Sequence, residues 1–124
     1  MQVYEIITEN DERTIPLEDS EAWKLKKYSK IDKKIEEILG PEVSRICIQS
    51  CCYLGTGKRF HIDVLAKNED EAMRILNENK EKLEKVYLLF GERIGNFRIW
   101  GSYPYRPPEK RSLLERLVTK IFDP

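Results

Sequence analysis

Two runs with alternating apolar side chains, residues 43–53 and 58–66, flank a turn that contains Gly55 and Gly57. Alternation around a glycine-containing turn predicts a β-hairpin. A three-residue loop from Gly55 to Gly57 suits this hairpin, because Gly57 readily takes the left-handed conformation that such a loop needs. Side chains alternate between the two faces of a strand, so the even-numbered positions are expected in the core. These positions are Ile46, Ile48, Cys52, Phe60, Ile62, Val64 and Ala66.

A strand and a helical segment precede the hairpin. Residues 2–8 are rich in β-branched and aromatic side chains, as strands are. A helix is expected near residues 20–39, with either Asp19 or Ser20 as its N-cap and Gly40-Pro41 as its stop. Ser29 offers a second N-cap, so either one helix or two helices fit the segment. The apolar stripe that defines it consists of Leu25, Tyr28, Ile31, Ile35, Ile38 and Leu39.

A second helix and a last strand follow the hairpin. Asn68 and Glu71 have the spacing of a capping box, which predicts a helix near residues 69–90 with Gly91 as its stop. The end of this helix is ambiguous, because residues 86–90 fit a short strand equally well. Residues 96–103 are expected to form the last strand, with alternating faces.

The resulting order of elements is strand, helix, strand, strand, helix, strand, which resembles the ferredoxin-like βαββαβ arrangement. The fold class expected is therefore α+β, an antiparallel sheet with two helices on one face. Residues 1–103 are assigned to this domain, and residues 104–124 to a proline-rich spacer and an appended C-terminal amphipathic helix. The expected core is Ile46, Ile48, Phe60, Ile62, Val64, Ile75, Leu83, Phe97 and Ile99.

Charge and cysteine content narrow the possible partners and compartment. The 22 basic and 22 acidic side chains cancel, so only a local patch can attract nucleic acid or an anionic membrane. Glu and Lys dominate the charged residues, a bias typical of thermophile proteins. Apolar runs are too short to cross a bilayer, and no membrane partner is expected. Three cysteines do not suggest a disulfide framework, which favours a reducing cytoplasm.

Alternation leaves one sheet face open, and that face holds the side chains that could take part in catalysis or binding. Its expected members are Arg45, Cys47, Gln49, Cys51, Tyr53, His61, Asp63, Leu65, Arg98 and Trp100. In the favoured register Cys51 lies directly opposite His61, which would allow a thiolate nucleophile with Asp63 as an orienting group. An open sheet supplies neither an oxyanion hole nor a dry pocket, so this catalytic interpretation is disfavoured and no cofactor is assigned.

A metal site is excluded by distance. Cys47 and Cys51 are four residues apart along one strand, so their α-carbons are roughly 13 Å apart. Zinc binds sulfur at about 2.3 Å and cannot bridge that span. Cys51 and Cys52 are adjacent, and they point to opposite faces.

Nucleic-acid binding is the alternative interpretation of the same face. Aromatic rings for stacking and cations for phosphates are both present, from Arg45, Tyr53, Lys58, Arg59, His61, Arg98 and Trp100. The aromatic-rich strand signature of RNA-binding domains is absent, however, and Asp63 lies in the middle of the platform.

The last segment of the chain favours self-association. Six large apolar residues lie within ten positions, and a short helix carrying them needs a surface on which to dock. They are Leu113, Leu114, Leu117, Val118, Ile121 and Phe122. The leading hypothesis is therefore a protein–protein interaction or homo-oligomeric assembly module, not an enzyme. RNA or single-stranded nucleic-acid binding is the alternative, and an enzyme or ligand binder with its site between subunits is the third.

Overall fold

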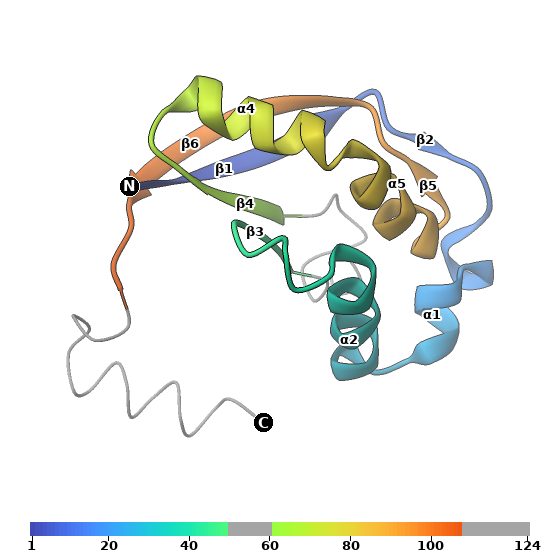
Figure 1. Cartoon of the computed structure of the whole chain (residues 1–124). Helices are drawn as coiled ribbons and strands as arrows, with labels where there is room; N and C mark the ends of the chain where they lie inside the picture. The colour runs from blue at the N-terminus through green and yellow to red at the C-terminus, as the bar shows by residue number, and fades with distance from the viewer. Residues whose placement is uncertain (50–60, 108–124) are drawn as a thin grey trace.

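The computed structural model describes residues 1–49 and 61–107 of the chain (Figure 1). Within these residues the fold is mixed α+β, with helices packed on a four-stranded antiparallel sheet. The strand order is β3-β4-β1-β6. The strands are β1 (Gln2–Glu9), β3 (Ile46–Gln49), β4 (His61–Ala66) and β6 (Asn96–Pro104). The predicted terminal helix lies outside the described residues.

The first helical segment is divided into two helices. A 3-10 turn, Leu17–Asp19, leads into α1 (Glu21–Leu25), and α2 (Tyr28–Leu39) follows. Ser20 is the N-cap of α1, as predicted, and its hydroxyl accepts from the Trp23 amide at 3.3 Å. The break falls at Lys26, which has a φ of 62°. Lys27 therefore precedes α2 as its N-cap, and the prediction of Ser29 in that role is wrong.

The second helical segment is also divided, into α4 (Glu69–Glu78) and α5 (Lys80–Leu89). The Asn68 side chain accepts from the Glu71 amide at 2.8 Å, which confirms the N-cap. The reciprocal half of the capping box is replaced, because the Glu71 carboxylate accepts from Arg45 at 2.6 Å. Residues 86–89 belong to α5, so the strand alternative for this stretch is wrong. Gly91 ends the helix with a φ of 75°.

A short two-stranded sheet continues the pairing of β1 with β6. Strands β2 (Glu12–Arg13) and β5 (Glu92–Arg93) pair in the register that β1 and β6 set at Glu9 and Asn96. Where the β1–β6 pairing stops and the β2–β5 pairing begins, the Asp11 side chain connects the two chain segments. Its carboxylate accepts from the Thr8 hydroxyl at 2.6 Å and from the Gly95 amide at 2.8 Å.

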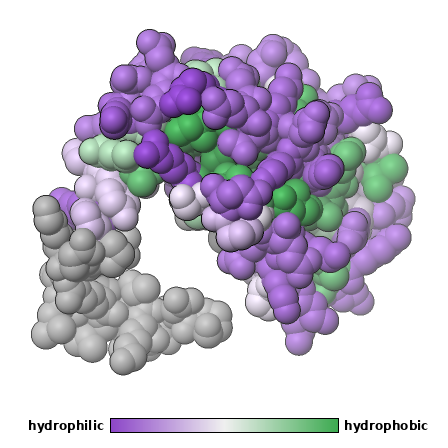
Figure 2. Space-filling model, viewed as in Figure 1, coloured by the Kyte–Doolittle hydropathy of each residue, from purple (hydrophilic) through white to green (hydrophobic). Residues whose placement is uncertain are grey.

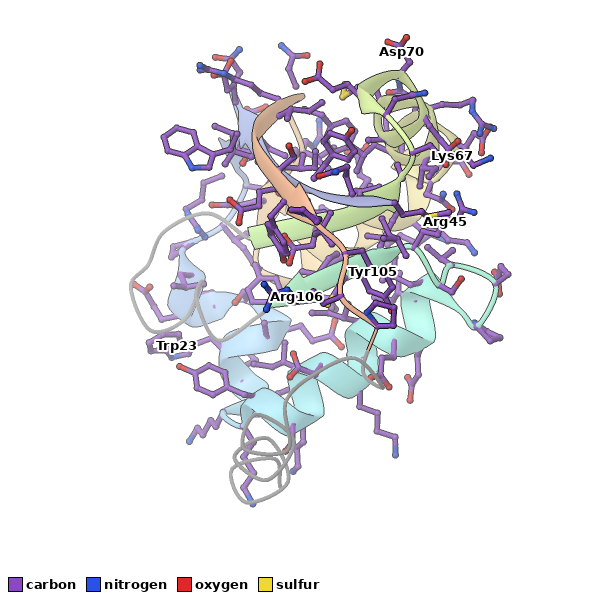
Figure 3. The ribbon with its side chains drawn as sticks, turned by 90° about the vertical axis from the view of Figure 1, so that its left-hand side faces the viewer. Trp23, Arg45, Lys67, Asp70, Tyr105 and Arg106 are labelled. Atoms are coloured by element: carbon purple, nitrogen blue, oxygen red, sulfur yellow. The ribbon has the colours of Figure 1, made fainter. Side chains whose placement is uncertain are left out.

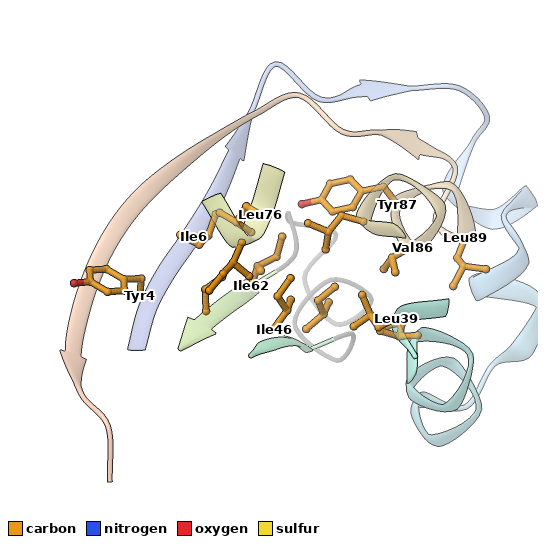
Figure 4. Close-up of a cluster of buried hydrophobic side chains, with 14 of the residues drawn as sticks. Tyr4, Ile6, Leu39, Ile46, Ile62, Leu76, Val86, Tyr87 and Leu89 are labelled. Carbon is orange, nitrogen blue, oxygen red and sulfur yellow. The ribbon is translucent and has the colours of Figure 1, made fainter. Parts of the chain in front are cut away.

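The core lies between the sheet and the helices (Figure 4). Helices α4 and α5 lie over one face of the sheet, and α2 packs beside α5 (Figure 1). The predicted core positions that the structure describes are buried, except that Phe97 and Ile99 are partly buried against the core. Phe60 and Cys52 lie outside the described residues. The largest buried side chains are Tyr87 and Phe90, from the end of the second helical segment.

The hairpin register differs from the predicted one. Gln49, and not Cys51, lies opposite His61, and Ile48 lies opposite Ile62. The partner of His61 is displaced by two residues. Glycines at positions 55 and 57 do not distinguish between two neighbouring turn centres, and moving the centre by one position shifts the pairing by two. A shift of two preserves which side chains face the core, so the face assignment of the described positions is confirmed although the pairing is wrong.

Substituting Gly95 tests the constraint between β1 and β6. A Cβ at this position would lie 1.9 Å from the Glu9 carbonyl oxygen, which is backbone and cannot move aside. Gly95→Ala is expected to lower the free energy of unfolding by about 1–3 kcal/mol, the usual cost of overpacking. Urea denaturation measures this change. Gly101→Ala is the matched control, since its Cβ would meet only the Glu5 carboxylate at 3.8 Å; an equal loss in both variants would contradict the argument.

Candidate functional site

The sheet face opposite the core, called the open face below, is organised in two rows. Strand register places Cys47, Asp63, Glu5 and Gly101 side by side across the four strands. The neighbouring row contains Leu65, Val3 and Tyr103. One row is therefore polar and acidic, and the other is apolar. The sequence predicted Cys47, Asp63 and Leu65 for this face but assigned none of the β1 residues to it.

A bulge in β6 decides which of its side chains reach the open face. Glu5 pairs with Gly101 and Ile6 pairs with Ile99, so Trp100 is the extra residue between them. A bulge shifts the alternation of the strand that carries it. Tyr103 consequently lies beside Val3, a position that strict alternation from Trp100 does not give it. The glycine that follows Trp100 was the available signal, because glycine inside a strand often marks a bulge.

A cleft of about 690 Å³ opens over the apolar row. Its far wall is the extended chain that leaves β6, and Tyr105 donates its amide to the Met1 carbonyl at 3.1 Å. In Figure 3 the end of β6 descends in front of β4 and β3, carrying Tyr105 and Arg106. The volume is within the range of ligand pockets. The lining consists of Val3, Ser44, Arg45, Cys47, Asp63, Leu65, Tyr103, Pro104, Tyr105 and Arg106.

Burial, together with negative charge at the centre of the open face, raises the pKa of two side chains on this face. Burial raises the pKa of the Cys47 thiol, and Asp63 and Asp32 raise it further. Burial likewise raises the pKa of Tyr103, with contributions from Asp63 and Glu5. Both shifts favour the protonated form. Cys47 is therefore a thiol at neutral pH and is not suited to be a nucleophile.

The structure describes two of the three residues of the catalytic interpretation, His61 and Asp63, both on β4. His61 pairs with Gln49, and Asp63 lies next to Cys47 on the neighbouring strand. Cys51 is outside the described residues. Within residues 1–49 and 61–107, no group of three or more His, Cys, Asp or Glu side chains is placed to hold a metal ion.

Of the residues of the nucleic-acid interpretation, the structure describes the surroundings of Arg45, Arg98 and Trp100. Arg45 pairs with Glu71 at 2.6 Å, and Arg98 pairs with Glu9 at 2.7 Å. Both cations are thus partly neutralised by carboxylates of the chain itself. Trp100 is 68% exposed at the bulge. The remaining candidates, Tyr53, Lys58 and Arg59, lie outside the described residues, as do the six apolar residues of the predicted terminal helix.

Comparison with known proteins adds no relative. The sequence matches no family model, no curated protein and no solved structure. Among the helices of the described residues, none combines the length and the apolar character needed to span a bilayer.

Alkylation of Cys47 tests the electrostatics of the open face. Removing the Asp63 charge in Asp63→Asn should lower the pKa of the thiol and speed alkylation at neutral pH, because the thiolate is the reactive form. The rate is measured by mass spectrometry of the peptide that contains Cys47. Asp70→Asn, an exposed charge in the first turn of α4, is the control and should leave the rate unchanged. A slower rate in Asp63→Asn would show that the carboxylate does not act through its charge.

Proposed function

We propose that this chain is a ferredoxin-like assembly module that associates with a second copy of itself through the open face. The order of its elements supports the fold: β1, a helical segment, β3, β4, a second helical segment and β6. The sheet order β3-β4-β1-β6 supports the same fold. Each strand pair joined by a helical segment is parallel and has one strand between its members: β4 lies between β1 and β3, and β1 lies between β4 and β6. Cys47, which forms no disulfide, suits a reducing cytoplasm.

The observation that carries the assembly hypothesis is the apolar row in the cleft. Val3 and Leu65 are only half-buried, and Tyr103 and Tyr105 are 46% and 41% exposed. Tyr103 and Tyr105 thus place two large aromatic rings at the cleft, and Trp100, which does not line it, is exposed earlier on β6. Aromatic side chains grouped in this way are enriched in the centres of protein interfaces.

The predicted terminal helix is the occupant that fits this cleft. The described chain ends at Pro107, next to cleft residues Tyr105 and Arg106, and only five residues of sequence separate Pro107 from Leu113, the first residue of the apolar segment. At about 100° per residue, its six apolar side chains cover about half of the helix circumference. One apolar row covers only part of such a stripe. The same helix of a second copy would cover the rest, which favours a symmetric dimer over docking within one chain.

Nucleic-acid binding through the open face has weaker support. Asp63 and Glu5 lie directly opposite each other at its centre, and they repel phosphates. Arg45 and Arg98 already have carboxylate partners. The charge pattern of this face therefore suits a protein surface better than a phosphate backbone.

A negative charge introduced into the apolar stripe of the terminal segment is expected to prevent assembly. Leu117→Glu places a carboxylate in the middle of the apolar stripe and should convert the dimer to a monomer, because burying an unpaired charge is costly. Sedimentation velocity on the full chain, on the order of tens of micromolar, measures the state. Leu88→Glu is the matched control at an exposed leucine of α5. A wild-type chain that sediments as a monomer, or a Leu117→Glu variant that still dimerises, would contradict the proposal.

The cleft itself is tested separately. Tyr103→Ser removes a large exposed ring from the apolar row and should weaken association roughly ten- to thirtyfold, as loss of an interface hot spot does. Tyr28→Ser removes an equally exposed ring from α2 and should not change the dissociation constant. Dilution series in the ultracentrifuge give both constants. Equal effects in the two variants would place the interface elsewhere while leaving the assembly itself standing.

A further inference from the structure

The first helical segment presents a dense group of lysines. Residues 23–34 contain six lysines and one acidic residue, Asp32, in a chain whose formal net charge is zero. All six lysines are exposed. The surface they form on α1 and the first half of α2, called the basic surface below, consists of Lys24, Lys26, Lys27, Lys30, Lys33 and Lys34. Figure 2 shows mostly hydrophilic residues over α2.

Two aromatic rings lie within this basic surface and face solvent. The left-handed residue Lys26 ends α1, and its amide donates to the Trp23 carbonyl at 3.2 Å. Trp23 precedes this turn and Tyr28 follows it, and each is 44% exposed. Helical periodicity placed Tyr28 in the core stripe, but the buried residues of α2 begin only at Ile31. Tyr28 is therefore excluded from the core by its position in the first turn. Figure 3 shows Trp23 at the edge of the molecule.

Most of the six lysines have no carboxylate of the described chain in direct contact, although Glu36 and Glu37 follow Lys33 by three and four positions on α2. Among the described residues, only Lys34 of the six has a carboxylate within 4.0 Å, Glu21. Lys30 is three and four positions before Lys33 and Lys34, spacings at which like charges on a helix repel. The arrangement is unfavourable in isolation. A polyanion bound across α1 and α2 would relieve this repulsion.

We propose that the basic surface binds single-stranded nucleic acid. The lysines contact successive phosphates, and the rings of Trp23 and Tyr28 stack on bases. A single strand is favoured over a duplex because its bases are free to stack on protein rings. A lipid surface is less suitable, since the apolar stripe of α2 is committed to the core through Ile31, Ile35 and Leu39. This site is separate from the open face and does not depend on assembly.

Salt dependence and substitution test the charge contribution. The probe is a fluorescein-labelled oligouridylate of about 12 nucleotides, and its binding to the full chain is followed by fluorescence anisotropy. For single strands, the slope of log K against log salt is about −0.7 per phosphate neutralised. The double variant Lys26→Ser with Lys27→Ser should make that slope less steep by about 1.4. Lys80→Ser with Lys85→Ser removes two exposed lysines of α5 and should leave the slope unchanged.

Stacking is tested with Trp23→Ala. This variant should weaken binding roughly five- to a hundredfold with the salt slope unchanged, because it removes a ring and no charge. Vesicles of phosphatidylcholine with phosphatidylserine form the second arm. The proposal is overturned if the oligonucleotide does not bind, if the α1–α2 and α5 lysine variants change the slope equally, or if Trp23→Ala binds normally. Binding to the vesicles without binding to the oligonucleotide would also overturn it, in favour of a membrane surface.

Discussion

The pairing of β1 along both of its edges is the constraint on which the rest of the structure depends. Its partners β4 and β6 come from the middle and the later part of the chain, and among the described strands no other strand pairs with both. The alternation of β1 then assigns Tyr4, Ile6 and Thr8 to the core and Val3 and Glu5 to the open face. Asp11 extends this ribbon by bonding to Thr8 and Gly95 across the interruption. One strand thus determines both the core and the composition of the candidate site.

The bulge at Trp100 determines how that site is shaped. Without an extra residue in β6, Trp100 would lie beside Glu5 and Ser102 beside Val3, and Tyr103 would face the core side. With it, Tyr103 joins Val3 and Leu65, and the chain continues past the cleft in an extended form. A bulge on an edge strand also interrupts the regular row of amides and carbonyls that would otherwise invite uncontrolled pairing. The same irregularity therefore protects the edge and builds the apolar row.

The sequence predicted buried positions correctly where an error in strand register does not change the face on which a side chain lies. Ile46, Ile48, Ile62 and Val64 were assigned correctly because a two-residue slip leaves every side chain on the same face. The pairing of Cys51 with His61 required the register itself, and glycines in the turn do not determine it. Tyr28 and Tyr103 were missed for local reasons, a helix end and a bulge, at which periodicity no longer applies. Both residues are among the exposed aromatic side chains of the described part of the chain.

Although the formal net charge is zero, the chain has two surfaces of opposite charge. Carboxylates meet at the centre of the open face, whereas lysines cover α1 and the first half of α2. An assembly held through the apolar row of the open face would leave the basic surface free. Two copies would then present two linked basic surfaces, and contact of a long single strand with the second would be intramolecular. Affinity for long strands would therefore exceed that of one copy without any new contact, which gives self-association a physical consequence for binding.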